Sequence, residues 1–97
     1  MTITAEQQRQ LKELRAIPGI GKSLALDLWN IGIRNIVALK NKNPKTLYRK
    51  LNKRTGTIQD PCVLYTFRCA VYFASEQVHD VEKLKWWYWK DNEYNEQ

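Results

Sequence analysis

The chain has 97 residues, 43% of them hydrophobic and 11% aromatic, and a formal net charge of +6. This length suits one domain with one core and is too short for a nucleotide-hydrolysing domain of ordinary size. The apolar content excludes a disordered tail, and no stretch approaches the ~20 apolar residues that cross a bilayer. The start of the chain lacks the cationic and apolar parts of a signal peptide, so we expect a cytoplasmic protein without a membrane partner.

Positive charge is concentrated in the first part of the chain. Residues 1–59 hold twelve Lys or Arg against three Asp or Glu, a balance of +9, whereas residues 60–97 hold four against seven, a balance of −3. A basic part beside an acidic part is typical of a protein with one face for a polyanion. The alternative is that the Lys and Arg side chains only solvate helices, and on charge content alone we favour this alternative.

Helical patterns run through most of the chain and predict an all-α fold. Capping residues, two of them followed by proline, mark expected helix starts at Thr4, Asn35, Asn43-Pro44 and Asp60-Pro61. The expected helices cover about 5–16, about 22–30, a short segment with Ile36 and Leu39, a segment from Pro44 through Leu51, and about 60–75. With a last segment over 80–90, they predict a compact bundle of five or six helices in a single domain over residues 1–97.

The helix expected over 60–75 is apolar nearly all round, apart from Thr66 and Arg68. A helix of this kind is buried, so we expect it at the centre of the bundle. The run from Trp86 to Trp89 follows it in the acidic part of the chain. These rings stack on unpaired bases, close the core, or stay exposed and bind a partner protein, and in so small a domain we expect packing.

Cys62 and Cys69 lie seven residues apart in this expected helix, about two turns, which is outside disulfide reach. The single histidine, His79, forms no recognised metal-binding spacing with them. We therefore expect no metal bound by side chains, and no cofactor.

The stretch "IPGIGKS" at residues 17–23 combines two glycines, a lysine and a hydroxyl, a composition typical of phosphate-binding loops. A nucleotide-hydrolysis loop needs a glycine where Ala16 stands and a strand before the loop, whereas residues 13–15 look helical. The alternative is a tight hairpin between two helices, here called the first hairpin (residues 17–22).

In the first hairpin, Gly19 and Gly21 allow the backbone to turn with positive φ, while Ile20 points inward. The outward-facing amides then precede a helix N-terminus, where anions are favoured. A backbone phosphate can be held there without any base being read. The residues expected to contact nucleic acid are Gly19, Ile20, Gly21, Lys22 and Ser23.

The stretch "LRAIPGIGKSLALDLWNIGI" (residues 14–33) resembles the helix-hairpin-helix motif of DNA polymerases, ligases and repair proteins. In that motif an apolar residue, Pro-Gly, an apolar residue and Gly precede a small residue, here Ala25. The resemblance implies phosphate contact through the amides of Gly19, Gly21 and Lys22. It also implies the site that holds a monovalent cation in some members of the motif family, on the carbonyls of Arg15, Ile17 and Ile20.

Over nearly its whole length the chain resembles the pathogenicity-locus family of small bacterial proteins, through "NIGIRNIVALKNKNPKTLYRKLN", "GTIQDPCVLYTFRCAVYFAS" and "KLKWWYWKD". This resemblance implies a helix-hairpin-helix (SAM-like) core with a degenerate second hairpin at residues 40–44, related to the first by a pseudo-two-fold axis. Pairs of this kind can grip both strands of a duplex across the minor groove. Because the second hairpin lacks glycines, its contacts would come from point charges on Lys42, Lys45, Arg49 and Lys53.

We expect a binding module and not an enzyme. Helix-hairpin-helix glycosylases carry an essential aspartate well downstream of the hairpin, whereas Asp27 stands only six residues after Gly21. The expected function is binding of nucleic acid, above all double-stranded DNA, without sequence preference. The alternative is a protein-interaction adaptor that uses the same helical fold, and the salt dependence of binding separates the two.

Overall fold

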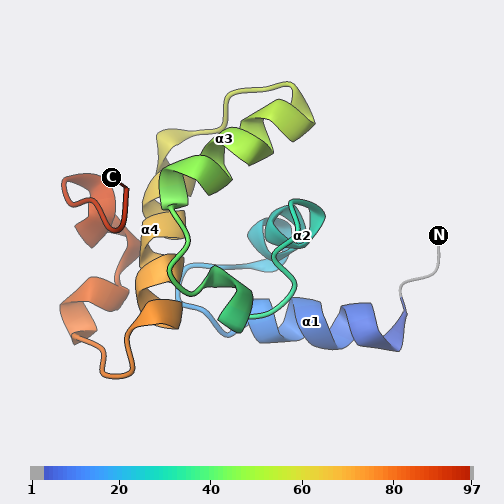
Figure 1. Cartoon of the computed structure of the whole chain (residues 1–97), viewed down its shortest axis with the longest axis horizontal. Helices are drawn as coiled ribbons and strands as arrows, with labels where there is room; N and C mark the ends of the chain where they lie inside the picture. The colour runs from blue at the N-terminus through green and yellow to red at the C-terminus, as the bar shows by residue number, and fades with distance from the viewer. Residues whose placement is uncertain (1–3, 97) are drawn as a thin grey trace.

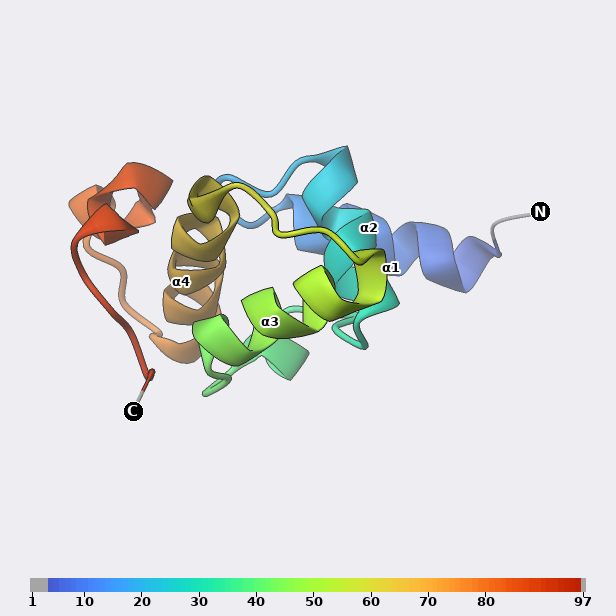
Figure 2. The same ribbon diagram turned by 90° about the horizontal axis from the view of Figure 1, so that it is seen from above.

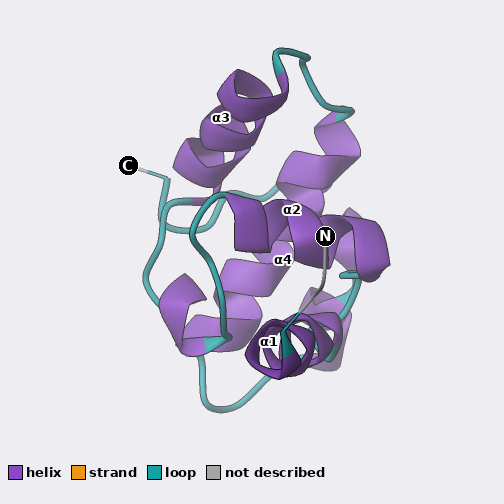
Figure 3. Ribbon diagram, turned by 90° about the vertical axis from the view of Figure 1, so that its right-hand side faces the viewer, coloured by secondary structure: helices purple, strands orange, loops and turns teal. Residues whose placement is uncertain are grey.

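Every regular element that the computed structural model describes, over residues 4–96, is a helix (Figure 1, Figure 3). The α-helices are α1 (Ala5–Arg15), α2 (Lys22–Asn30), α3 (Pro44–Thr55) and α4 (Pro61–Ser75). The 3-10 helices are η1 (Val37–Leu39), η2 (Val81–Leu84) and η3 (Trp86–Lys90). The all-α class is confirmed. The number of α-helices differs from the expected five or six, because the short third segment and the last segment form 3-10 turns.

None of the helices within residues 4–96 combines the length and the apolar character that a bilayer crossing requires. All four α-helices begin at or within one residue of the expected starts. Three of them begin on a side chain that accepts a backbone amide. Thr4, Asn43 and Asp60 accept these bonds at 2.8 to 3.2 Å from amides two or three residues ahead. Local capping chemistry therefore sets the starts of α1, α3 and α4.

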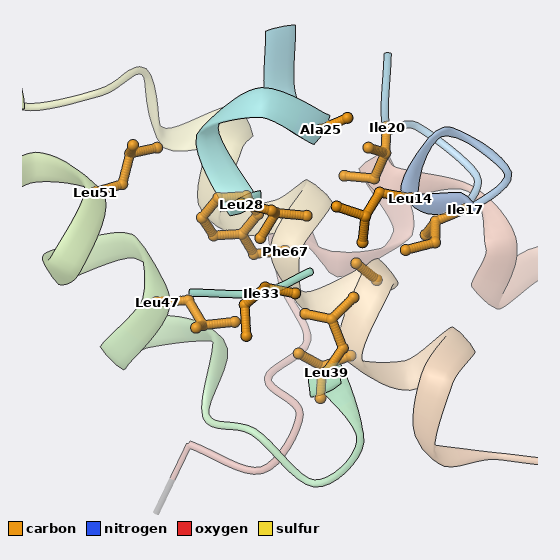
Figure 4. Close-up of a cluster of buried hydrophobic side chains, with 12 residues drawn as sticks. Leu14, Ile17, Ile20, Ala25, Leu28, Ile33, Leu39, Leu47, Leu51 and Phe67 are labelled. Atoms are coloured by element: carbon orange, nitrogen blue, oxygen red, sulfur yellow. The ribbon is translucent and has the colours of Figure 1, made fainter. Parts of the chain in front are cut away.

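Helix α4 is central, as its sequence predicts. All residues from Thr66 to Tyr72 are buried, and Phe67 lies in the middle of the main hydrophobic cluster (Figure 4). Side chains from the other α-helices and from the turns between them surround this ring. The buried members of the cluster are Leu14, Ile17, Ile20, Ala25, Leu28, Ile33, Leu39, Leu47, Leu51, Phe67, Ala70 and Val71.

The tryptophan-rich segment, η3 with Trp86 to Trp89, packs on the side of α4 that faces away from the other α-helices (Figure 2). Trp89 is only 3% exposed and forms a second buried cluster with Cys69 and Tyr72. Its indole N–H donates to the carbonyl of Lys83 at 2.8 Å, so its polar atom is satisfied. The expected packing role is confirmed for Trp89, whereas Trp87 is 58% exposed.

Both cysteines are free thiols, Cys62 exposed and Cys69 buried. Burial raises the pKa of the Cys69 thiol to about 11, so this thiol stays protonated at neutral pH. Residues 4–96 contain no group of three or more His, Cys, Asp or Glu side chains that could hold a metal ion.

A buried ion pair ties the end of the described chain to α4. The guanidinium of Arg68 donates from Nε and Nη2 to the two carboxylate oxygens of Glu96, at 2.7 and 3.0 Å. Its Nη1 donates to the carbonyl of Trp89 at 2.8 Å. The side chain of Arg68 is 7% exposed and that of Glu96 is 0% exposed. The pair therefore holds the last described residues against the tryptophan-rich segment, and both charged groups are buried.

Replacing Glu96 by Ala is expected to destabilise the fold by about 3 kcal/mol, because it leaves a buried guanidinium without a counter-ion. The free energy of unfolding, measured by urea titration, checks this. The matched control is Glu93→Ala, since Glu93 meets Lys45 only at 3.9 Å and its side chain is 61% exposed. Equal losses in the two variants would contradict the role given to the buried pair.

Candidate nucleic-acid interface

The first hairpin is built on a tight turn between α1 and α2. The amide of Ile20 donates to the carbonyl of Ile17 at 3.1 Å and closes this turn. Pro18 fills its second place and Gly19, with φ of +84°, its third. This is the residue pattern of a type II turn, which requires a positive φ at the third place. The glycine at this position is therefore fixed by backbone geometry.

Two isoleucines anchor the turn in the core. Ile17 is 1% exposed and Ile20 is 4% exposed, and both lie beside Leu14 of α1 (Figure 4). The side chain of Ile20 points inward, as the sequence predicts. Because both apolar side chains point into the protein, the main chain between and after them lies at the surface.

Gly19 also lies close to the central part of the molecule. A Cβ atom at this residue would stand 3.2 Å from Cγ2 of Thr66 on α4 and 3.6 Å from Cβ of Trp86. The turn therefore packs against α4 and the start of η3. Gly19 itself remains exposed, so the tryptophan-rich segment does not cover the hairpin.

The backbone amides of the first hairpin are open to solvent. Gly21 is the N-cap of α2 and supplies no side-chain hydrogen bond, in contrast to the N-caps of the other α-helices. Among the hydrogen bonds of residues 4–96, none uses the amide of Gly19, Gly21 or Lys22. The exposed residues here are Gly19, Gly21, Lys22 and Ser23. Only the amide of Ile20 is already used, inside the turn.

Positive side chains lie beside these amides. An open groove of about 470 Å³ runs between α1 and α2, and its lining includes Lys12, Arg15 and Lys22. None of the described residues that line it is acidic. The side chains of Lys12 and Arg15 are not among the contacts expected from the sequence. Their spacing of three residues on one helix face could have suggested them, but not that this face adjoins α2.

The second hairpin is closed by the protein itself. The Nδ2 group of Asn95 donates to the carbonyls of Asn41 and Lys42, at 2.7 and 3.1 Å. The amide of Asn41 donates to Oγ of Ser75 at 2.9 Å. At the start of α3, Oδ1 of Asn43 accepts the first two free amides of the helix. These backbone groups are therefore occupied without any ligand.

The two hairpins lie near opposite ends of α4. In Figure 2 the loop between α1 and α2 lies near the start of α4, where Gly19 adjoins Thr66, and the loop before α3 lies near its end, where Asn41 bonds to Ser75. Of the basic residues expected to act there, Lys45 lies 3.9 Å from Glu93, whereas Lys42, Arg49 and Lys53 are exposed. The joint grip on one duplex that a pseudo-two-fold pair implies stays a prediction.

Asp27 and His79, the two titratable residues that the sequence analysis considered for catalysis or metal binding, both lie outside the groove beside the first hairpin. Asp27 is half-buried in the middle of α2, and burial raises the pKa of its carboxyl. The ring of His79 stacks on Phe73 with 4.7 Å between the ring centroids, and its Nε2 lies 2.8 Å from the carbonyl of Phe73. Neither side chain lines the groove beside the first hairpin.

Residues 7–95 match the family described as "Pathogenicity locus" (Cdd1). The chain belongs to this family. This pathogenicity-locus protein is also similar to "Mitomycin resistance protein McrB" of Streptomyces lavendulae, with 30% identity over 77 residues, which cover 79% of this chain and 70% of that protein. No solved structure matches it. The family resemblance inferred from the sequence is confirmed.

Replacing Gly19 by Ala is expected to lower the free energy of unfolding by about 1–2 kcal/mol, because Ala must adopt a positive φ. The matched control is Gly21→Ala, where φ is −93° and no atom lies within 4 Å of the added Cβ. This control should stay within about 0.5 kcal/mol of the wild type. Urea titration of both variants measures the difference, and equal stabilities would contradict the turn geometry.

Proposed function

We propose that this pathogenicity-locus protein binds the phosphate backbone of nucleic acid through the first hairpin, without reading base sequence. Double-stranded DNA is the proposed target. The observation that carries the proposal is a set of unoccupied amides, those of Gly19, Gly21 and Lys22, on an exposed turn. These amides stand at or just before the positive end of α2, which favours an anion.

The finer fold assignment is part of this proposal. We assign α1, the turn and α2 to a helix-hairpin-helix unit, on the sequence resemblance of residues 14–33. Three features support the assignment: the buried Ile17 and Ile20, the positive φ of Gly19, and the fully buried Ala25 where α2 packs closely. Each is a feature that a close approach of two helices around a short turn requires.

The residues of the first hairpin have different roles in the proposed contact. The amides of Gly21 and Lys22 donate to phosphate oxygens, and the side chains of Lys22 and Ser23 add a cation and a hydroxyl donor. Lys12 and Arg15 attract the backbone from the adjacent groove. Ile20 acts through the shape of the turn, since its side chain is buried and its amide is used internally.

A monovalent cation would have fewer free carbonyls than the motif implies. The carbonyl of Ile17 already accepts the amide of Ile20 at 3.1 Å. The other two carbonyls of the proposed cation site belong to Arg15 and Ile20. A cation there would share the Ile17 oxygen with the hydrogen bond that closes the turn.

A protein-interaction adaptor is the second candidate, and exposed apolar side chains favour it. Val78 is 87% exposed, Val81 is 71% exposed and Trp87 is 58% exposed, all in the segment after α4. Exposed apolar side chains mark a protein-interaction surface where they gather into one patch. An adaptor of this kind would show little affinity for a duplex at any salt concentration.

Fluorescence anisotropy of a labelled DNA duplex, titrated over a salt series, tests the proposal. A backbone binder loses affinity with a log-log slope of about −0.9 for each phosphate contact. Gly21→Glu places a carboxylate beside the free amides and should weaken binding by about tenfold or more. Lys22→Ala should make the slope shallower by about one contact.

The matched control for Gly21→Glu is Val78→Glu, which adds the same charge on an 87% exposed residue after α4. It should bind the duplex nearly as the wild type does. Equal binding by the Gly21→Glu variant and the wild type would remove the first hairpin from the mechanism. Absence of duplex binding by the wild type would overturn the proposal in favour of the adaptor.

A further inference from the structure

A second basic surface lies at the opposite end of α2 from the first hairpin. Two openings, of about 760 and 370 Å³, adjoin there and share Ile31, Gly32 and Lys50 in their linings. Gly32 has a φ of +99° and no atom within 4 Å of its missing Cβ, so the backbone is open. We name this surface the basic groove. Its cations are Arg34, Lys42, Lys50, Lys53 and Arg54.

The basic groove carries positive charge that the protein does not neutralise. None of its described lining residues is acidic, and within residues 4–96 none of its five cations forms an ion pair. Lys50, Lys53 and Arg54 project from one side of α3, where like charges three or four residues apart repel one another. Such a cluster costs stability in the free protein, and a polyanion would relieve that cost.

One cation of the basic groove is held in place. The guanidinium carbon of Arg34 lies 3.7 Å from the centre of a Trp29 ring. The indole N–H of Trp29 in turn donates to Oε1 of Gln10 on α1, at 2.8 Å. Stacking on an aromatic face restricts the guanidinium before any ligand arrives. A restricted side chain loses less freedom on binding.

The composition of the basic groove favours nucleic acid over an acidic protein. Three of the five cations are lysines, Lys42, Lys50 and Lys53. Lysine is depleted in protein–protein interfaces. No aromatic side chain lines either opening among the described residues, so the groove lacks the aromatic anchors typical of protein recognition. Exposed lysine and arginine beside an open backbone are the contacts that phosphate groups take.

The two basic surfaces lie toward opposite faces of the molecule. Figure 1 looks down the shortest axis, along which the molecule extends 20 Å, and shows α2 almost end-on. The nine residues of α2 therefore run from one broad face toward the other over about 13 Å. The first hairpin stands at the start of this helix and the basic groove at its end.

We infer that the basic groove binds a second segment of nucleic acid, so that one molecule holds two segments, one toward each broad face. The inference rests on the proposed function, because it requires that the first hairpin binds the first segment. It assigns a binding role to Arg34, Lys50 and Arg54, which the sequence analysis did not single out. The activity that follows is bridging of two duplexes.

A bead assay with two unrelated duplexes tests bridging. One duplex is biotinylated and immobilised, the other is fluorescent, and the full chain is added at about 50 mM salt, where phosphate contacts are strong. The wild type should retain the fluorescent duplex on the beads. The Lys50→Glu/Lys53→Glu variant should lose at least about 80% of this retention while its anisotropy affinity for one duplex falls by no more than about threefold. The milder Lys50→Gln/Lys53→Gln variant should show the same pattern.

The matched control is Arg9→Glu/Lys90→Glu, which makes the same change in charge outside both surfaces and should bridge as the wild type does. Single-duplex binding without retention by the wild type would overturn the inference and leave the proposed function standing. Retention by the Lys50→Glu/Lys53→Glu variant would also overturn it, because bridging would then arise from association of two copies. Absence of single-duplex binding would overturn both.

Discussion

The burial of Ile17 and Ile20 at the two ends of one turn is the constraint on which the candidate site depends. Both side chains lie in the core, whereas Gly19, Gly21 and Lys22 beside them are exposed. Glycine at residue 19 allows the turn, because the backbone there has a positive φ and a Cβ atom would lie only 3.2 Å from Cγ2 of Thr66 on α4. The hydrophobic core thus determines which hydrogen-bond donors are presented to solvent.

The two hairpins show how one residue type at the helix start changes what a turn can do. Asn43 satisfies the first amides of α3 with its own side chain, whereas Gly21 leaves those of α2 unsatisfied. The first arrangement stabilises a helix, and the second keeps the helix end available to an anion. The backbone amides at the start of α3 are therefore satisfied within the protein, whereas those at the start of α2 have no hydrogen-bond partner among residues 4–96.

The sequence predicted what local chemistry decides and missed what depends on distant contacts. Caps such as Asn43 and Asp60 were predicted because their partners lie two or three residues away. The pairing of Arg68 with Glu96 was not, since nothing local relates residues 28 apart. The basic groove was missed for the same reason: helical spacing places Lys50 with its neighbours on one side of α3, but only the tertiary structure shows that this side meets the end of α2.

The ion pair on α4 has a consequence for the order in which the molecule is completed. Arg68 is synthesised 28 residues before its counter-ion, Glu96. Until Glu96 follows, burying the guanidinium beneath the aromatic segment would leave a charge without a partner in an apolar environment. The arrangement in which Trp89 packs over α4 and both buried charges are paired therefore requires that Glu96 has been synthesised.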